Sequence, residues 1–105
     1  MKWIDARKTL LEEGFIEFGP FRVELTLDNT FMELDYIPRV AVYWDVDGRW
    51  HVLRNPIPKG KTLKEGWINA VNLLEAILRG EEWPRFDDEV LERAFVNSIQ
   101  ASFQL

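Results

Sequence analysis

Apolar side chains recur at helical spacing near the start of the chain and then alternate with polar ones. Trp3, Ala6 and Leu10 lie at positions i, i+3 and i+7, and Gly14 can adopt the left-handed conformation that ends a helix. This spacing predicts a helix over residues 3–13. Residues 21–27 alternate without a break, as expected of a strand with one buried side.

Turn residues divide the middle of the chain into further strands. Gly19-Pro20 separates residues 15–18 from 21–27, and another strand is expected over 32–36, ending before Pro38. The strongest hairpin pattern covers residues 40–54, where Asp47-Gly48 supplies the positive φ angles of a two-residue type I′ turn. The expected register pairs Val46 with Arg49, Asp45 with Trp50, Trp44 with His51, Tyr43 with Val52 and Val42 with Leu53.

Two more helices are predicted after this hairpin. Thr62 and Glu65 form a capping box, and Gly80 can end the helix that follows, which gives residues 63–79. Most of the circumference of this helix is apolar, so we expect it to be the central core helix. The last helix runs from about residue 88 to about residue 102, with Asp87 as its N-cap.

These elements predict one α+β domain over residues 1–105. The order is α-β-β-β-β-β-α-α, and the short connections favour an antiparallel meander over crossover units. We therefore expect a sheet of about five strands, packed by an N-terminal helix and two C-terminal helices.

Composition narrows the chemistry open to this domain. The chain has 105 residues, a formal charge of −5, one His and no Cys, which excludes disulfides, thiol nucleophiles and multi-histidine metal sites. His51 is either a general base beside Asp45 or Asp47, or a half-buried structural imidazole. No convergent catalytic set is present, so we expect no enzymatic activity, cofactor or metal. The chain start lacks an apolar signal segment, and no stretch could span a membrane, so a cytoplasmic protein is expected.

Residues 40–79 combine a hairpin with a capped helix start. The pattern consists of the hairpin around Asp47-Gly48, then Pro56-Ile57-Pro58-x-Gly60, then Thr62-Leu63-x-Glu65. It resembles the core segment of HicB-type antitoxins. The resemblance implies a toxin as partner, with DNA binding supplied by a separate C-terminal module. Residues 81–105 are acidic and have no helix-turn-helix pattern, so DNA binding is not carried over.

Positive charge is concentrated in residues 49–64, which contain no acidic residue. The cations are Arg49, Arg54, Lys59, Lys61 and Lys64. One interpretation is a site for nucleic acid or a small anionic ligand, with Trp50 available for stacking. The other is a solvated loop that offsets the acidic helices, and a net charge of −5 opposes long-range attraction to nucleic acid.

Aromatic residues point to a protein partner. Five Trp, seven Phe and two Tyr either all fill one core or leave some rings at the surface. One side of the hairpin can pack under helices, whereas Tyr43, Trp50 and Val52 on the other side need a second cover or a partner. The favoured function is therefore a small acidic interaction module of the antitoxin, immunity-protein or phage-inhibitor kind. A basic partner suits its charge, and a homodimer could use the same surface.

Overall fold

The computed structural model describes residues 1–28 and 36–105, and these form an α+β fold. Helix α1 (Trp3–Glu13) precedes the strands, which are β1 (Phe15–Phe18), β2 (Phe21–Asp28), β3 (Ile37–Trp44) and β4 (Arg49–Val52). Helices α2 (Leu63–Leu78) and α3 (Glu89–Ser102) follow them. The four strands form one antiparallel sheet in the order β1-β2-β3-β4, so the expected meander is confirmed.

The helices begin and end close to the predicted residues because local capping determines their ends. Gly14 ends α1 with a φ of 83°, and the Thr62 hydroxyl accepts the Glu65 N–H at 3.1 Å at the start of α2. Gly80, with a φ of 77°, follows the end of α2. The predicted N-cap of α3 was wrong: the carboxylate of Asp88 accepts the Val90 N–H at 2.8 Å, while Asp87 pairs with Arg54.

The predicted strand at residues 32–36 falls mostly on residues 29–35, which lie outside the described residues. Tyr36 is described and forms an isolated antiparallel bridge with Gly60. Strand β3 begins at Ile37, so Pro38 lies inside a strand instead of ending one. The Pro38 nitrogen points toward the β4 side of the sheet. Strand β4 has already ended there, because its last pair with β3 is Val52–Ala41. Pro38 therefore removes no ladder hydrogen bond.

The register of the β3–β4 hairpin differs from the predicted one. Trp44 pairs with Arg49, so a loop over residues 45–48 replaces the two-residue turn. A type I′ turn needs positive φ at both central residues, but of Asp47 and Gly48 only Gly48 has it, at 66°. The Asp47 carboxylate instead accepts the Arg49 N–H at 3.0 Å.

As a result, Tyr43 pairs with Trp50 and not with Val52, while Val42 pairs with His51. The shift moves each pairing by two residues. Because side chains alternate with a period of two, every side chain that stays in the two strands keeps its predicted side of the sheet.

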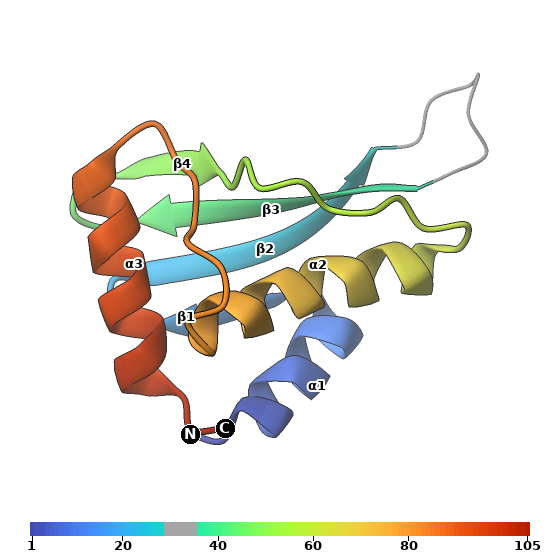
Figure 1. Cartoon of the computed structure of the whole chain (residues 1–105), viewed down its shortest axis with the longest axis horizontal. Coiled ribbons are helices and arrows are strands. Elements are labelled where there is room, and N and C mark those ends of the chain that lie inside the picture. Colours follow the sequence, from blue (N-terminus) through green and yellow to red (C-terminus); the bar gives the residue numbers. More distant parts are fainter. Residues whose placement is uncertain (29–35) are drawn as a thin grey trace.

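All three helices lie on one side of the sheet (Figure 1). The strand residues that face them, including Val23, Val40 and Val42, are fully buried. The central core helix is confirmed as α2, whose Ala70, Val71, Leu74 and Ile77 have at most 1% exposure. No helix or strand of the described residues covers the other side, which we call the open face. The open face includes Phe15, Glu17, Arg22, Glu24, Thr26, Ile37, Arg39, Ala41, Tyr43, Trp50 and Val52.

The first prediction concerns Gly60, where the loop before α2 passes closest to the helix. A Cβ at Gly60 would lie 2.7 Å from the Gly66 Cα and 2.9 Å from the Glu65 carbonyl carbon. Because these are backbone atoms, we expect Gly60→Ala to lower the free energy of unfolding by about 2 kcal/mol, measured by urea denaturation.

Gly80→Ala is the control. Its Cβ would meet nothing within 4 Å, so only the positive φ is penalised, by about 1 kcal/mol. If Gly60→Ala were the milder substitution, the close approach between loop and helix would not be a constraint.

Candidate functional site

The half of the open face formed by β1 and β2 is occupied by a charged network. The Arg22 guanidinium donates hydrogen bonds to the carboxylates of Glu17 at 2.7 Å and Glu24 at 2.8 Å. The hydrogen bonds to Glu24 and Glu17 raise the pKa of Arg22 above its ordinary value. Its guanidinium carbon lies 4.0 Å from the centre of the Phe15 ring. The charges of this half are therefore largely paired with one another.

The half formed by β3 and β4 carries the apolar residues that the sequence singled out. Tyr43 and Trp50 are direct cross-strand partners with ring centres 5.4 Å apart and planes inclined at 56°. Trp50 is 50% exposed and Val52 is 49% exposed. The structure thus brings Tyr43, Trp50 and Val52 together on the open face, and we call these three residues the aromatic patch.

The backbone of β4 is also accessible beside this patch. The Leu53 N–H donates to the Val40 carbonyl at 2.9 Å. Because residues of an antiparallel strand point alternately toward and away from their neighbour, the N–H and C=O groups of Trp50 and Val52 point away from β3. Strand β4 is the last strand of the described sheet, so these groups lie along its edge.

A second chain segment fixes the end of this edge. The Asn55 amide donates to the Trp83 carbonyl at 2.9 Å, and its oxygen accepts the Arg85 N–H at 2.8 Å. The Arg54 N–H donates to the Arg85 carbonyl at 2.9 Å. Asn55 is 5% exposed, so both of its polar atoms are satisfied in a buried position. The connection between α2 and α3 therefore closes the edge beyond Leu53.

His51 lies on the helix side of β4 and contacts the hairpin loop. Its Nε2 is 2.8 Å from Asp47 Oδ2, and its ring centre lies 6.4 Å from that of Phe86, with the two ring planes inclined at 79°. Partial desolvation by itself would raise the pKa of Asp47, but the hydrogen bonds from His51 and the Arg49 N–H outweigh it and lower that pKa. Of the two carboxylates expected near His51, the structure places Asp47 beside it, and the contact joins β4 to the hairpin loop.

The basic residues of the segment 49–64 do not converge on one place. Arg49 follows the hairpin loop, and the Arg54 guanidinium pairs with the Asp87 carboxylate. Lys59 and Lys61 lie in the connection that leads to α2. Lys64 lies at the start of α2 and lines a hollow together with Arg7 and Lys8 of α1. An anion site formed by all five cations would need this segment to rearrange.

Val46 is an accessible residue that the sequence analysis placed in a strand opposite Arg49. It lies in the hairpin loop and is 71% exposed. The signal that could have revealed this position is the capacity of Asp47 to accept a nearby backbone N–H, which competes with the type I′ turn.

The chain matches no protein family, and no curated protein or solved structure gives a significant match. The resemblance of residues 40–79 to HicB-type antitoxins therefore stays a prediction from the sequence. Over residues 1–28 and 36–105, no group of three or more His, Asp or Glu side chains is placed to hold a metal ion. None of the helices described is long and apolar enough to cross a bilayer.

The second prediction follows from the lowered pKa of Asp47. A carboxyl whose pKa is lowered by folding stabilises the fold fully above its unfolded-state pKa, about 4, and this effect disappears as the pH falls through the folded-state pKa. We expect Asp47→Asn to be less stable than the wild type at about pH 6, and the difference to vanish by about pH 2, measured by urea denaturation.

Asp45→Asn removes the same charge from the same loop and serves as the control. A stability difference between wild type and Asp47→Asn that stayed constant down to the lowest pH would contradict the role given to the Asp47 carboxylate.

Proposed function

We propose that the protein is a small interaction module that binds a basic partner protein through the aromatic patch. The observation that carries this proposal is the half exposure of Trp50 and Val52 on the side of the sheet without a helix. A Trp side chain buries a large area on binding and loses few rotatable bonds, which is why Trp is frequent among the residues that dominate binding energy.

The contacts around Trp50 support this use. Tyr43 packs against the Trp50 ring, so the ring is held in place before a partner arrives and less side-chain entropy is lost on binding. The free N–H and C=O groups of Trp50 and Val52 can pair with an extended segment of the partner. The partner would thus be held by ring contacts on the open face and by backbone hydrogen bonds along the edge of β4.

The charge distribution favours a basic partner. The chain carries a formal charge of −5, and the exposed carboxylates of Asp45 and of Glu17, which pairs with Arg22, line one hollow beside Tyr43. Complementary charge increases the rate of association and makes it sensitive to salt. Covering a surface of a basic protein is the kind of action expected of an antitoxin, immunity protein or phage inhibitor.

The alternative function, binding of nucleic acid or a small anionic ligand through residues 49–64, has weaker support. Arg54 is already paired with Asp87, and the five cations are spread from the hairpin to the start of α2. A homodimer through the aromatic patch would bring together two chains that each carry a formal charge of −5, and like charges oppose such pairing.

The third prediction tests the aromatic patch. Proteins captured from cells by the wild type are identified and purified, and their affinities for the variants are measured by calorimetry. We expect Trp50→Ala to weaken binding by roughly thirtyfold, which is about 2 kcal/mol, because it removes the central ring contact. Val52→Ser should weaken it by a smaller factor.

Val90→Ser is the matched control, since Val90 is an exposed Val (67%) on α3, away from the open face. Equal affinities for the wild type and Trp50→Ala would contradict the proposal. A wild-type dimer in sedimentation that Trp50→Ala dissociates would also overturn it, in favour of the homodimer.

A further inference from the structure

A second accessible edge lies at the other end of the sheet, on β1. The Leu25 N–H donates to the Gly14 carbonyl at 2.8 Å, so the backbone groups of Gly14, Ile16 and Phe18 face β2. By the same alternation, the N–H and C=O groups of Phe15 and Glu17 point away from the sheet. Neither residue makes a backbone hydrogen bond on that outer side to any other part of the described chain.

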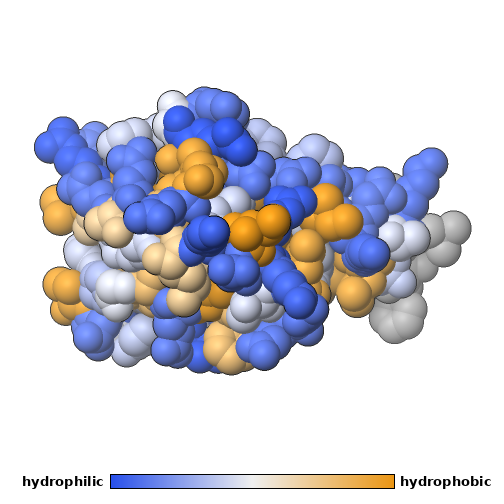
Figure 2. All heavy atoms as spheres, turned by 90° about the horizontal axis from the view of Figure 1, so that it is seen from below, coloured by the Kyte–Doolittle hydropathy of each residue, from blue (hydrophilic) through white to orange (hydrophobic). Residues whose placement is uncertain are grey.

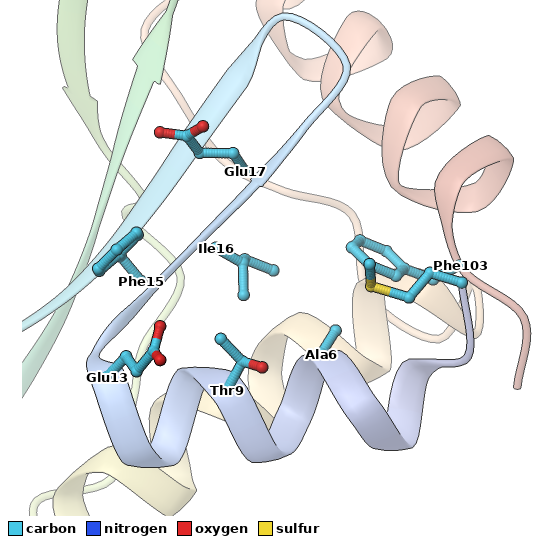
Figure 3. Close-up of a pocket in the computed structure, with 8 residues that line it drawn as sticks. Ala6, Thr9, Glu13, Phe15, Ile16, Glu17 and Phe103 are labelled. Carbon is cyan, nitrogen blue, oxygen red and sulfur yellow. The ribbon is translucent and has the colours of Figure 1, made fainter.

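A groove runs along this edge, between β1 and α1 (Figure 3). Its volume is about 240 Å³, which is enough for a large apolar side chain. Ala6 and Thr9 of α1 point into it from one wall, Ile16 of β1 from the other, and Phe103 closes one end. The interior of the groove is therefore mainly apolar.

The rim of the groove is acidic. Glu13, the last residue of α1, lies at the end opposite Phe103, and Glu17 lies on β1 above the groove (Figure 3). Both side chains are exposed, and Glu17 shares the single guanidinium of Arg22 with Glu24, so this cluster keeps an excess of one negative charge. The hollow on the opposite flank of α1 is lined by three cations, Arg7, Lys8 and Lys64, and by one carboxylate, Glu12, so the two flanks of this helix differ in charge. The groove along β1 is on the acidic flank.

We propose that this groove binds an extended segment of a partner protein in which cationic and apolar residues alternate. The segment would add to the sheet as a strand beside β1, and its backbone would pair with the outward N–H and C=O groups of Phe15 and Glu17. The pleat of the sheet dictates the alternation. Residues on the inner side would enter the groove above Ala6, while residues on the outer side would lie beside the Glu17 carboxylate.

The surface around the groove fits a narrow segment better than a second folded subunit. Seen from the side of α1, the apolar residues form separate patches divided by polar side chains (Figure 2). A stable interface between folded subunits needs a broader continuous apolar centre. A second copy of this chain would also bring its own acidic groove rim against Glu13 and Glu17. Strand addition of a cationic segment avoids both problems.

This surface is distinct from the aromatic patch and does not depend on the function proposed for it. Strand β1 and strand β4 are the two opposite edges of the described sheet. A partner segment on β1 would leave Trp50 uncovered, so the two surfaces can be tested separately.

The fourth prediction uses four ten-residue peptides in which Lys alternates with Val, Leu, Phe or Tyr, titrated into the full chain at low salt. We expect at least one of them to bind, with its largest amide chemical-shift changes at Phe15 and Glu17. Glu13→Lys should weaken binding by about tenfold, because it places a cation at the rim of the groove. Glu12→Lys is the matched control, since Glu12 lies on the opposite flank of α1, and it should weaken binding by less than about threefold.

The backbone contribution is tested by Glu17→Pro and Glu17→Thr. Both remove the Glu17 carboxylate, but only proline also removes the outward N–H, and it leaves the ladder hydrogen bonds to β2 intact. We expect Glu17→Pro to bind at least about tenfold more weakly than Glu17→Thr. In the wild type, the Glu17 amide should become protected from hydrogen exchange when the peptide is bound, which does not depend on the folding of any variant.

Three results would overturn the proposal: no binding by any of the four peptides, equal binding by Glu13→Lys and Glu12→Lys, or shifts centred on Trp50 and Val52. Trp50→Ala should bind the peptides as the wild type does. Failure of the groove would therefore leave the aromatic patch untouched, and failure of the patch would leave the groove untouched.

Discussion

The fold depends on one constraint: a single layer of helices covers only one side of the four-stranded sheet. Each strand alternates inward and outward side chains, so burying Val23, Val40 and Val42 under α2 necessarily turns their neighbours the other way. On β1 and β2 those neighbours include Glu17, Arg22 and Glu24, which pair with one another. On β3 and β4 they include Tyr43 and Trp50, which no such pairing can satisfy. The aromatic patch therefore arises from the sheet being covered on one side, combined with the sequence of the β3–β4 hairpin.

Hydrogen bonds outside the sheet determine where this patch begins and ends. At one end, the Asp47 carboxylate accepts the Arg49 N–H and contacts His51, and this arrangement aligns Trp50 with Tyr43. At the other end, Asn55 binds the segment that joins α2 to α3, and this segment takes up the Arg54 N–H. The accessible part of the β4 edge is consequently short. It contains Trp50 and Val52, whose side chains also form the exposed part of the patch, so backbone and side-chain contacts with a partner would come from the same two residues.

The sequence predicted the parts of this structure that depend on local interactions. Helix α1 and the start of α2 follow from apolar spacing and from caps within a few residues, and the open side of the hairpin follows from strict alternation. The hairpin register could not be predicted, because two turn geometries compete and the side-chain hydrogen bonds of Asp47 decide between them. Helix α3 begins at Glu89, so Asp88 is its N-cap, while Asp87 pairs with Arg54, which is distant in the sequence. The groove between α1 and β1 needs Phe103, from the far end of the chain, so no local pattern indicates it.

The two edges of the sheet differ in the chemistry they offer, although both come from short strands. An exposed strand edge can pair unspecifically with strands of other chains. A short edge strand limits such pairing because it can form few backbone hydrogen bonds. β1 and β4 each have four residues, of which two point their backbone groups outward. Two residues of backbone pairing provide little affinity on their own, so side chains must decide what binds. On β4 those side chains are the rings of Trp50 and Tyr43, and on β1 they are the carboxylates of Glu13 and Glu17 above an apolar groove. A partner that matches one edge therefore has no reason to match the other, and two different surfaces can coexist on one small sheet.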